Sequence, residues 1–124
     1  MKNKLEYSFD DEPVSKFCYD IVGNKIEVHF RGYYDSDKDE SIETPCIWII
    51  ENWEYAKSII GDEQRRYDLN KHIGIFSLIL YMKYNDDNEL EIYVITTDNR
   101  YITFFFKEPD LSLKTVHPVI RPPN

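Results

Sequence analysis

Residues 73–107 read IGIFSLILYMKYNDDNELEIYVITTDNRYITFFFK and form the densest apolar segment of the chain. Two polar interruptions divide it, Asn-Asp-Asp-Asn at residues 85–88 and Asp-Asn at residues 98–99, and both consist of residue types that favour turns. The apolar parts are rich in β-branched and aromatic residues, which favour a pleated sheet over a buried helix. The segment therefore predicts an antiparallel meander of three strands.

A register follows if Tyr84 pairs with Glu89 and Thr97 pairs with Arg100. Because successive residues of a strand point to opposite faces, this pairing assigns each side chain to one face. The predicted core face holds Phe76, Leu78, Leu80, Met82, Tyr93, Ile95, Ile102, Phe104 and Phe106. The opposite face is amphipathic and should be covered by a helix, a second sheet or another protein; it holds Ile79, Tyr81, Ile92, Val94, Thr96, Tyr101, Thr103 and Phe105.

Residues 17–30 predict a separate hairpin. Apolar and polar residues alternate on either side of Gly23-Asn24, a pair that suits a two-residue turn. Pairing Val22 with Lys25 gathers the large apolar side chains on one face: Phe17, Tyr19, Ile21, Ile26, Val28 and Phe30. The other face should be solvated and holds Cys18, Asp20, Glu27, His29 and Arg31.

The run at residues 46–51 predicts a strand that is buried on both faces, with Trp48 in the core. Pro45 stands at its start, where proline is tolerated. Asn52 then suits a helix N-cap, and the apolar spacing predicts a short helix that ends at Gly61. Residues 62–71 are polar and fit either another helical turn or an exposed loop.

The two ends of the chain carry weaker patterns. Leu5, Tyr7 and Phe9 alternate, so residues 1–12 should be partly ordered and form at most a short edge strand. A last short strand should follow Pro109, with apolar positions at Leu111, Leu113 and Val116. The prolines Pro118, Pro122 and Pro123 exclude regular structure, which predicts an extended tail over residues 118–124.

Together these patterns predict a single mainly β (α+β) domain over residues 1–124. We expect an antiparallel sheet of about six to seven strands, half-barrel or sandwich-like, with one or two short helices around residues 53–71. A chain of 124 residues can bury a sizeable core without disulfides or metals.

The net charge of −8, from 23 acidic and 15 basic residues, restricts the class of partner. Such a field repels phosphate backbones, which argues against nucleic-acid binding, and attracts basic proteins. Cys18 and Cys46 lack a CxxC spacing, and the first twelve residues are charged, unlike a signal peptide. No run is long enough for a membrane span. We therefore expect a cytoplasmic protein with free thiols.

The densest acidic stretch is residues 32–43. Asp35, Asp37 and Asp39 have the spacing that opens a calcium loop, but Glu40 stands where that loop needs glycine and Cys46 where it needs a bidentate glutamate. We expect no metal and no cofactor. The stretch is therefore either a solvated loop or a protein-binding patch.

No catalytic residues are predicted, and the chain is not expected to be an enzyme. The three histidines, His29, His72 and His117, lie on separate elements without metal-ligand spacing. Cys18 and His29 would lie opposite each other in the predicted hairpin. A nucleophile also needs an orienting group and oxyanion donors in a pocket, and the pattern indicates neither.

The candidate partner-binding residues are the acids of residues 35–43 and the aromatic residues that flank them. Aromatic side chains beside charges are typical of interface anchors. The predicted set is Tyr34, Asp35, Asp37, Asp39, Glu40, Glu43 and Trp53.

A small, acidic, β-rich chain with Gly32-Tyr33-Tyr34-Asp35, a strand led by Pro45, and Asn52-Trp53 resembles bacterial immunity proteins of contact-dependent or polymorphic toxin systems. The resemblance is one of general character over residues 17–107. It implies a cognate toxin domain, often a basic nuclease, that is neutralised by direct occlusion. We expect the protein to be a monomer or a weak dimer. Two other classes stay open: a small-ligand-binding β-barrel protein, which needs a deep pocket, and a structural subunit that self-associates through its sheet face.

Overall fold

The structure is a computed structural model that describes residues 5–115, and it contains three antiparallel sheets. The five-stranded sheet has the order β8 (Tyr67–Asp68), β7 (Tyr55–Ile60), β11 (Tyr101–Lys107), β10 (Glu89–Thr96) and β9 (Phe76–Tyr84). The four-stranded sheet has the order β12 (Asp110–Thr115), β6 (Cys46–Glu51), β3 (Lys25–Phe30) and β2 (Val14–Asp20). The smallest sheet joins β1 (Tyr7–Ser8), β4 (Tyr33–Asp35) and β5 (Glu40–Ile42).

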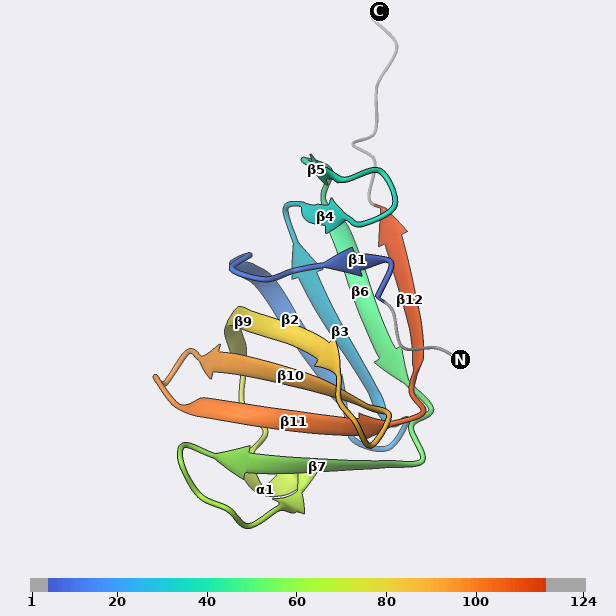
Figure 1. The fold of residues 1–124 in the computed structure, drawn as a ribbon. Helices are drawn as coiled ribbons and strands as arrows, with labels where there is room; N and C mark the ends of the chain where they lie inside the picture. The colour runs from blue at the N-terminus through green and yellow to red at the C-terminus, as the bar shows by residue number, and fades with distance from the viewer. Residues whose placement is uncertain (1–4, 116–124) are drawn as a thin grey trace, which may run out of the picture.

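The two larger sheets pack face to face, and their strands cross one another (Figure 1). The prediction of a mainly β fold of antiparallel strands is confirmed. The predicted single sheet is wrong, because the strands divide among three sheets that do not close into a barrel. The predicted strands at residues 46–51 and after Pro109 are present as β6 and β12. Val116 and the prolines of the tail lie outside the described residues.

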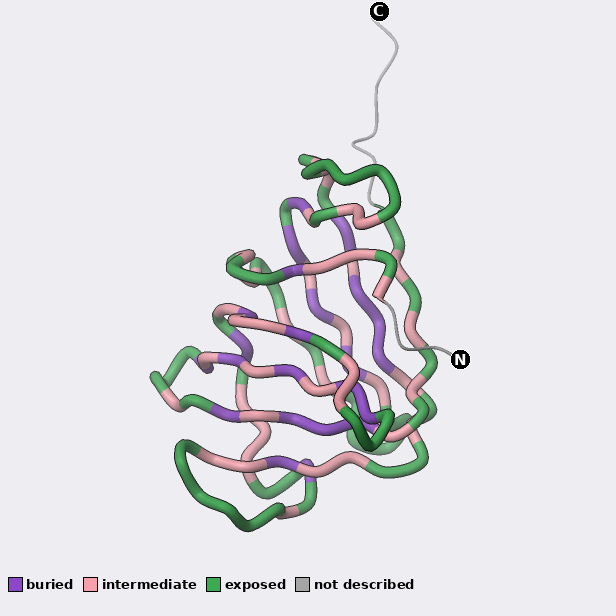
Figure 2. The backbone as a smooth tube through the Cα atoms, viewed as in Figure 1, coloured by how far each residue is buried: buried purple, intermediate pink, exposed green. Residues whose placement is uncertain are grey.

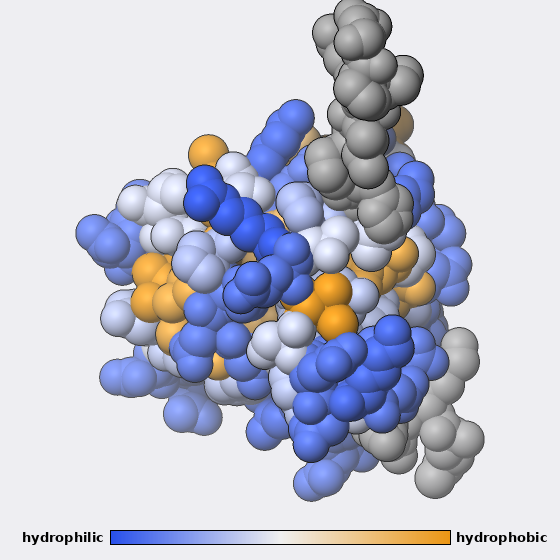
Figure 3. All heavy atoms as spheres, turned by 90° about the horizontal axis from the view of Figure 1, so that it is seen from above, coloured by the Kyte–Doolittle hydropathy of each residue, from blue (hydrophilic) through white to orange (hydrophobic). Residues whose placement is uncertain are grey.

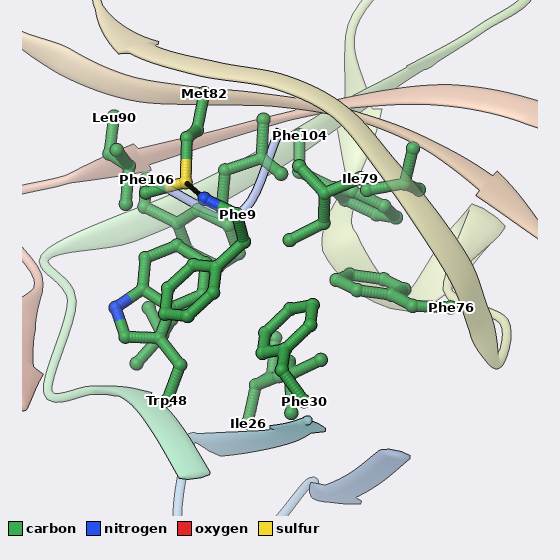
Figure 4. Close-up of a cluster of buried hydrophobic side chains, with 14 of the residues drawn as sticks. Phe9, Ile26, Phe30, Trp48, Phe76, Ile79, Met82, Leu90, Phe104 and Phe106 are labelled. Atoms are coloured by element: carbon green, nitrogen blue, oxygen red, sulfur yellow. Dashed lines mark hydrogen bonds between the residues drawn. The ribbon is translucent and has the colours of Figure 1, made fainter. Parts of the chain in front are cut away.

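The core lies between the two larger sheets, where buried and partly buried residues alternate along strands such as β3 and β10 (Figure 2). Trp48 is fully buried there, as predicted. Phe9 is also fully buried and stacks on Phe30 with 4.2 Å between ring centroids (Figure 4). The N-terminal segment is thus more than an edge strand, because it inserts an aromatic ring into the centre of the sandwich.

The meander β9–β10–β11 is present, but the predicted register is wrong by one residue. Residues 97–99 form a three-residue turn in which Asn99 has a φ of 63°, so Ile95 pairs with Tyr101 and Val94 with Ile102. A one-residue shift moves a whole strand to the other face. The core residues of β10 are therefore Leu90, Ile92 and Val94, and the predicted Tyr93 and Ile95 lie on the outer face.

Strand β9 contains two register irregularities that the sequence did not reveal. One of them is at Leu80, which has no pairing partner on β10. Its neighbours are paired, Tyr81 with Tyr93 and Ile79 with Val94. An extra residue of this kind reverses the side-chain alternation beyond it. Ile79 is buried as a result, whereas the predicted core residues Leu78 and Leu80 are only partly buried.

The faces predicted for the β2–β3 hairpin are confirmed, but its register is wrong by two residues. The turn has four residues, 21–24, so Asp20 pairs with Lys25 and Phe17 with Val28. A shift of two residues preserves the faces. It places the predicted Ile21 outside the core, and the neighbouring Val22 is 96% exposed.

The helix predicted after Asn52 is wrong, because residues 55–60 form β7, paired with β11 along its whole length. Asn52 has a φ of 55° and turns the chain from one sheet to the other, which an extended N-cap residue would not do. In the described chain the only helix is α1 (Leu69–His72), a single turn anchored by buried Leu69. No helix of residues 5–115 has the length and apolar character needed to cross a membrane.

Candidate functional site

The predicted acidic loop is a hairpin of two short strands, β4 and β5, at the top of the molecule in Figure 1. Tyr33 pairs with Ile42 and Asp35 with Glu40, and residues 36–39 form the turn. On its other side, β4 pairs with β1. The acidic residues are therefore held on a defined backbone instead of a free loop.

Two of the acids shape the turn. The carboxylate oxygen Oδ1 of Asp35 accepts hydrogen bonds from the backbone N–H groups of Asp37, at 3.0 Å, and Lys38, at 3.2 Å. Asp39 adopts a φ of 51°, and its Oδ1 accepts a hydrogen bond from the Tyr34 hydroxyl. The Asp35 side chain thus mimics a backbone turn contact, as aspartates commonly do.

The other three acids, Asp37, Glu40 and Glu43, are exposed and take no part in an ion pair within the described residues. Lys38 is the one cation of the hairpin turn, so the charge of this region is mostly uncompensated. Figure 3, which views the molecule from the hairpin end, shows hydrophilic side chains over most of this surface, with small separate apolar areas. The hairpin can therefore offer several carboxylates to a cationic partner at little desolvation cost.

The structure brings Tyr34 together with the acids but places Trp53 elsewhere. Tyr34 is exposed on β4 beside Asp39. Trp53 follows the far end of β6 and packs on Phe106, with ring centroids 5.1 Å apart. Because β6 separates the two aromatic residues, Trp53 belongs to the edge of the core and does not flank the hairpin.

Gly32 positions the hairpin by a close approach of two backbone segments. A Cβ atom at this residue would lie 2.6 Å from the carbonyl oxygen of Ile42 and 3.5 Å from the Cα of Glu43. Both are backbone atoms, so a side chain at position 32 could be accommodated only by moving β4 away from the base of β5.

We therefore expect Gly32→Ala to lower the free energy of unfolding by about 1–3 kcal/mol, the usual range for overpacking. Chemical denaturation measures this loss. Ser41→Ala, an exposed substitution on the neighbouring β5, is the matched control and should change stability by less than about 0.5 kcal/mol. Equal stability of the two variants would show that the backbones do not need this approach.

Within the described residues, no group of three or more His, Cys, Asp or Glu side chains is arranged to hold a metal ion. Cys18 lies opposite Glu27 and not opposite His29, so the predicted Cys–His neighbours are separated by the register shift. A different histidine, His72, lies beside a serine, with 3.0 Å between its Nδ1 and the Oγ of Ser58. Partial burial lowers the pKa of His72. Ser58 is fully buried, which leaves its hydroxyl without access for a substrate.

Sequence reasoning missed a charged network centred on Glu89, whose side chain is 1% exposed. Arg66 donates two hydrogen bonds to its carboxylate, at 2.8 and 3.1 Å. The Tyr55 hydroxyl donates at 2.6 Å and the Asn85 amide at 3.0 Å. The Arg66 guanidinium also lies 3.9 Å from the centroid of the Phe105 ring. These residues come from four separate segments, and no spacing in the sequence points to their association.

The network explains why Glu89 tolerates burial: each carboxylate oxygen is bonded to more than one donor. It fastens the segment between β7 and β8 to the turn between β9 and β10. No protein family, curated protein or solved structure was found to match this chain.

Proposed function

We propose that this protein binds a basic protein partner through the β4–β5 hairpin and neutralises it by occlusion. The observation that carries the proposal is the set of exposed carboxylates on this structured hairpin. These carboxylates form no ion pair with a cation of the described chain. The net charge of −8 adds a long-range field of the same sign. The resemblance to immunity proteins suggests the partner's class, a toxin domain such as a basic nuclease.

The chemistry suits a neutralising protein, which must reach its target before the target reaches its substrate. A negative surface raises the association rate with a positive partner, and carboxylates can occupy a cleft that binds phosphates. Exposed Tyr34, whose hydroxyl donates to Asp39, supplies an aromatic contact beside the charges. The small-ligand alternative has less support, because the sheets do not close into a barrel and large side chains fill the space between them.

Charge reversal on the hairpin should slow association with the partner. The test variant is the triple replacement of Asp37, Glu40 and Glu43 by lysine, which spares the two aspartates that shape the turn. We expect the association rate at low salt to fall about tenfold or more and its salt dependence to flatten. Stopped-flow mixing with the partner, for which the product of the neighbouring gene is the first candidate, measures both quantities.

A second triple variant changes the net charge equally at exposed positions away from the hairpin: Asp62, Glu63 and Asp86, each replaced by lysine. If both triple variants slow association to the same extent, net charge alone acts and the hairpin is not the landing site. Neutralisation has its own readout, the survival of cells that co-express the partner and this protein. Loss of viability despite co-expression would refute the toxin-neutralising role even if binding is observed.

A further inference from the structure

Three tyrosines form a row across the outer face of the five-stranded sheet: Tyr81 on β9, Tyr93 on β10 and Tyr101 on β11. Adjacent ring centroids are 5.4 and 6.0 Å apart. We call this row, with Glu91 beside it, the tyrosine face. In Figure 1 the side of β10 and β11 that faces the viewer is not covered by another strand or helix. The four-stranded sheet covers the opposite side.

The aromatic rings of this face are available to a partner. Tyr101 is 47% exposed, and Tyr81 and Tyr93 are partly exposed. Within residues 5–115, the hydroxyls of Tyr93 and Tyr101 make no hydrogen bond, whereas the Tyr81 hydroxyl donates to Glu91 at 2.6 Å. Burial and this bond raise the pKa of Tyr81 to about 12, so its hydroxyl remains a donor at neutral pH.

The protein already binds one of its own arginines on the same face. Arg66 lies over the ring of Phe105 and pairs with Glu89 through two hydrogen bonds. Stacking on an aromatic ring combined with a bidentate bond to a carboxylate is the arrangement that a planar guanidinium favours. Lys83 also lies over a ring of this face, with 5.4 Å between its Nζ and the centroid of Tyr81.

Glu91 repeats the position of Glu89 two residues further along β10, and therefore on the same face of the sheet. Its side chain is 15% exposed. The oxygen Oε2 accepts the Tyr81 hydroxyl and lies 3.8 Å from the Nζ of Lys83. No donor of the described chain bonds the other oxygen, Oε1. Tyr93 follows two residues later on the same face, so a carboxylate oxygen and an open ring stand side by side.

We propose that the tyrosine face binds an arginine side chain of a protein partner, with the guanidinium stacked on Tyr93 and hydrogen-bonded to Glu91. In this site Glu91 would play the part that Glu89 plays for Arg66, and a tyrosine ring would play the part of Phe105. The excess of acidic residues in the chain favours a cationic occupant, and the ring row favours arginine over lysine because a guanidinium stacks on aromatic faces and is weakly hydrated. This surface lies apart from the acidic hairpin, and the inference does not depend on the function proposed there.

The test uses the full chain and two small probes at constant ionic strength, N-acetyl-arginine methylamide and its neutral isostere N-acetyl-citrulline methylamide. Proton–nitrogen and aromatic NMR spectra report where each probe binds. We expect the arginine probe to shift the resonances of Tyr93, Tyr101 and Glu91 in a saturable way and the citrulline probe to leave them unchanged. Glu91→Gln and Tyr93→Leu should each weaken the arginine probe's binding about three- to tenfold.

Tyr34→Leu, which removes an exposed tyrosine on the hairpin, is the matched control and should leave binding at the tyrosine face unaltered. The proposal is overturned if the arginine probe shifts only hairpin resonances, or if Glu91→Gln binds the probe as well as the original protein does. It is also overturned if the tyrosine-face resonances broaden with protein concentration and Tyr93→Leu abolishes that broadening, because the face would then be a contact between two copies. Spectra of each variant without probe verify that the sheet is intact.

Discussion

Replacing Glu89 by glutamine is expected to lower the free energy of unfolding by about 2–4 kcal/mol at neutral pH. The amide cannot accept all the hydrogen bonds from Arg66, Tyr55 and Asn85, and the guanidinium loses its counter-ion. Arg66 is 37% exposed and can regain water, which keeps the loss below that of a fully buried charge. Urea denaturation followed by tryptophan fluorescence measures the difference.

The same substitution should change the pH dependence of stability. Burial by itself would raise the pKa of Glu89, but the hydrogen bonds from Arg66, Tyr55 and Asn85 outweigh burial and lower the pKa from 4.5 to about 2. A depressed carboxyl pKa contributes stability that is complete above the unfolded value, near 4.5, and is lost as the pH falls towards 2. The contribution lost over this interval is about 3 kcal/mol.

We therefore expect the stability of the original protein to fall more steeply between pH 5 and 2 than the stability of Glu89→Gln. The difference in slope should correspond to about one proton taken up on unfolding. Glu40→Gln, at an exposed carboxylate on β5, is the matched control and should follow the original curve. Parallel curves for the original protein and Glu89→Gln would show that Glu89 is not held ionised by the network.

Phe9→Ala is expected to cost about 3–5 kcal/mol of stability, the range for removing a fully buried phenylalanine. Its ring stacks on Phe30 and lies 5.0 Å from Trp48, and its backbone N–H approaches the Met82 sulfur at 3.4 Å (Figure 4). The cavity would open between the two larger sheets, and β1 would lose the anchor that holds it across β4. The midpoint of urea denaturation reports the loss.

Ile21→Ala is the matched control, since it also removes a large apolar side chain but from an exposed turn. It should change stability by less than about 0.5 kcal/mol. A loss below 1 kcal/mol for Phe9→Ala would mean that the N-terminal segment is dispensable to the core. Hydrogen exchange of the β4 backbone amides would show whether detaching Phe9 also loosens the acidic hairpin.

Where local pattern and tertiary contacts agree, the sequence predicted the structure. The apolar run with Trp48 is β6 in the core, and alternation assigned Phe17, Tyr19, Ile26, Val28 and Phe30 to one face of the β2–β3 hairpin. For the candidate site, the sequence placed Tyr34 together with the acids that follow it. It did not show that two of these acids form the turn, because that depends on the backbone conformation of residues 36–39.

By itself the sequence determined a mainly β fold with an acidic surface and strands near residues 46–51 and 76–107, because alternation, β-branched residues and charge are local properties. Register was decided by the tertiary structure: a third turn residue before Arg100 and the unpaired Leu80 each move side chains between faces. Residues 55–60 have helical spacing but form β7 because β11 offers a strand edge to pair with. The contacts of Phe9 with Phe30, and of Glu89 with Arg66, join segments far apart in the chain, and only the packed sheets bring them together.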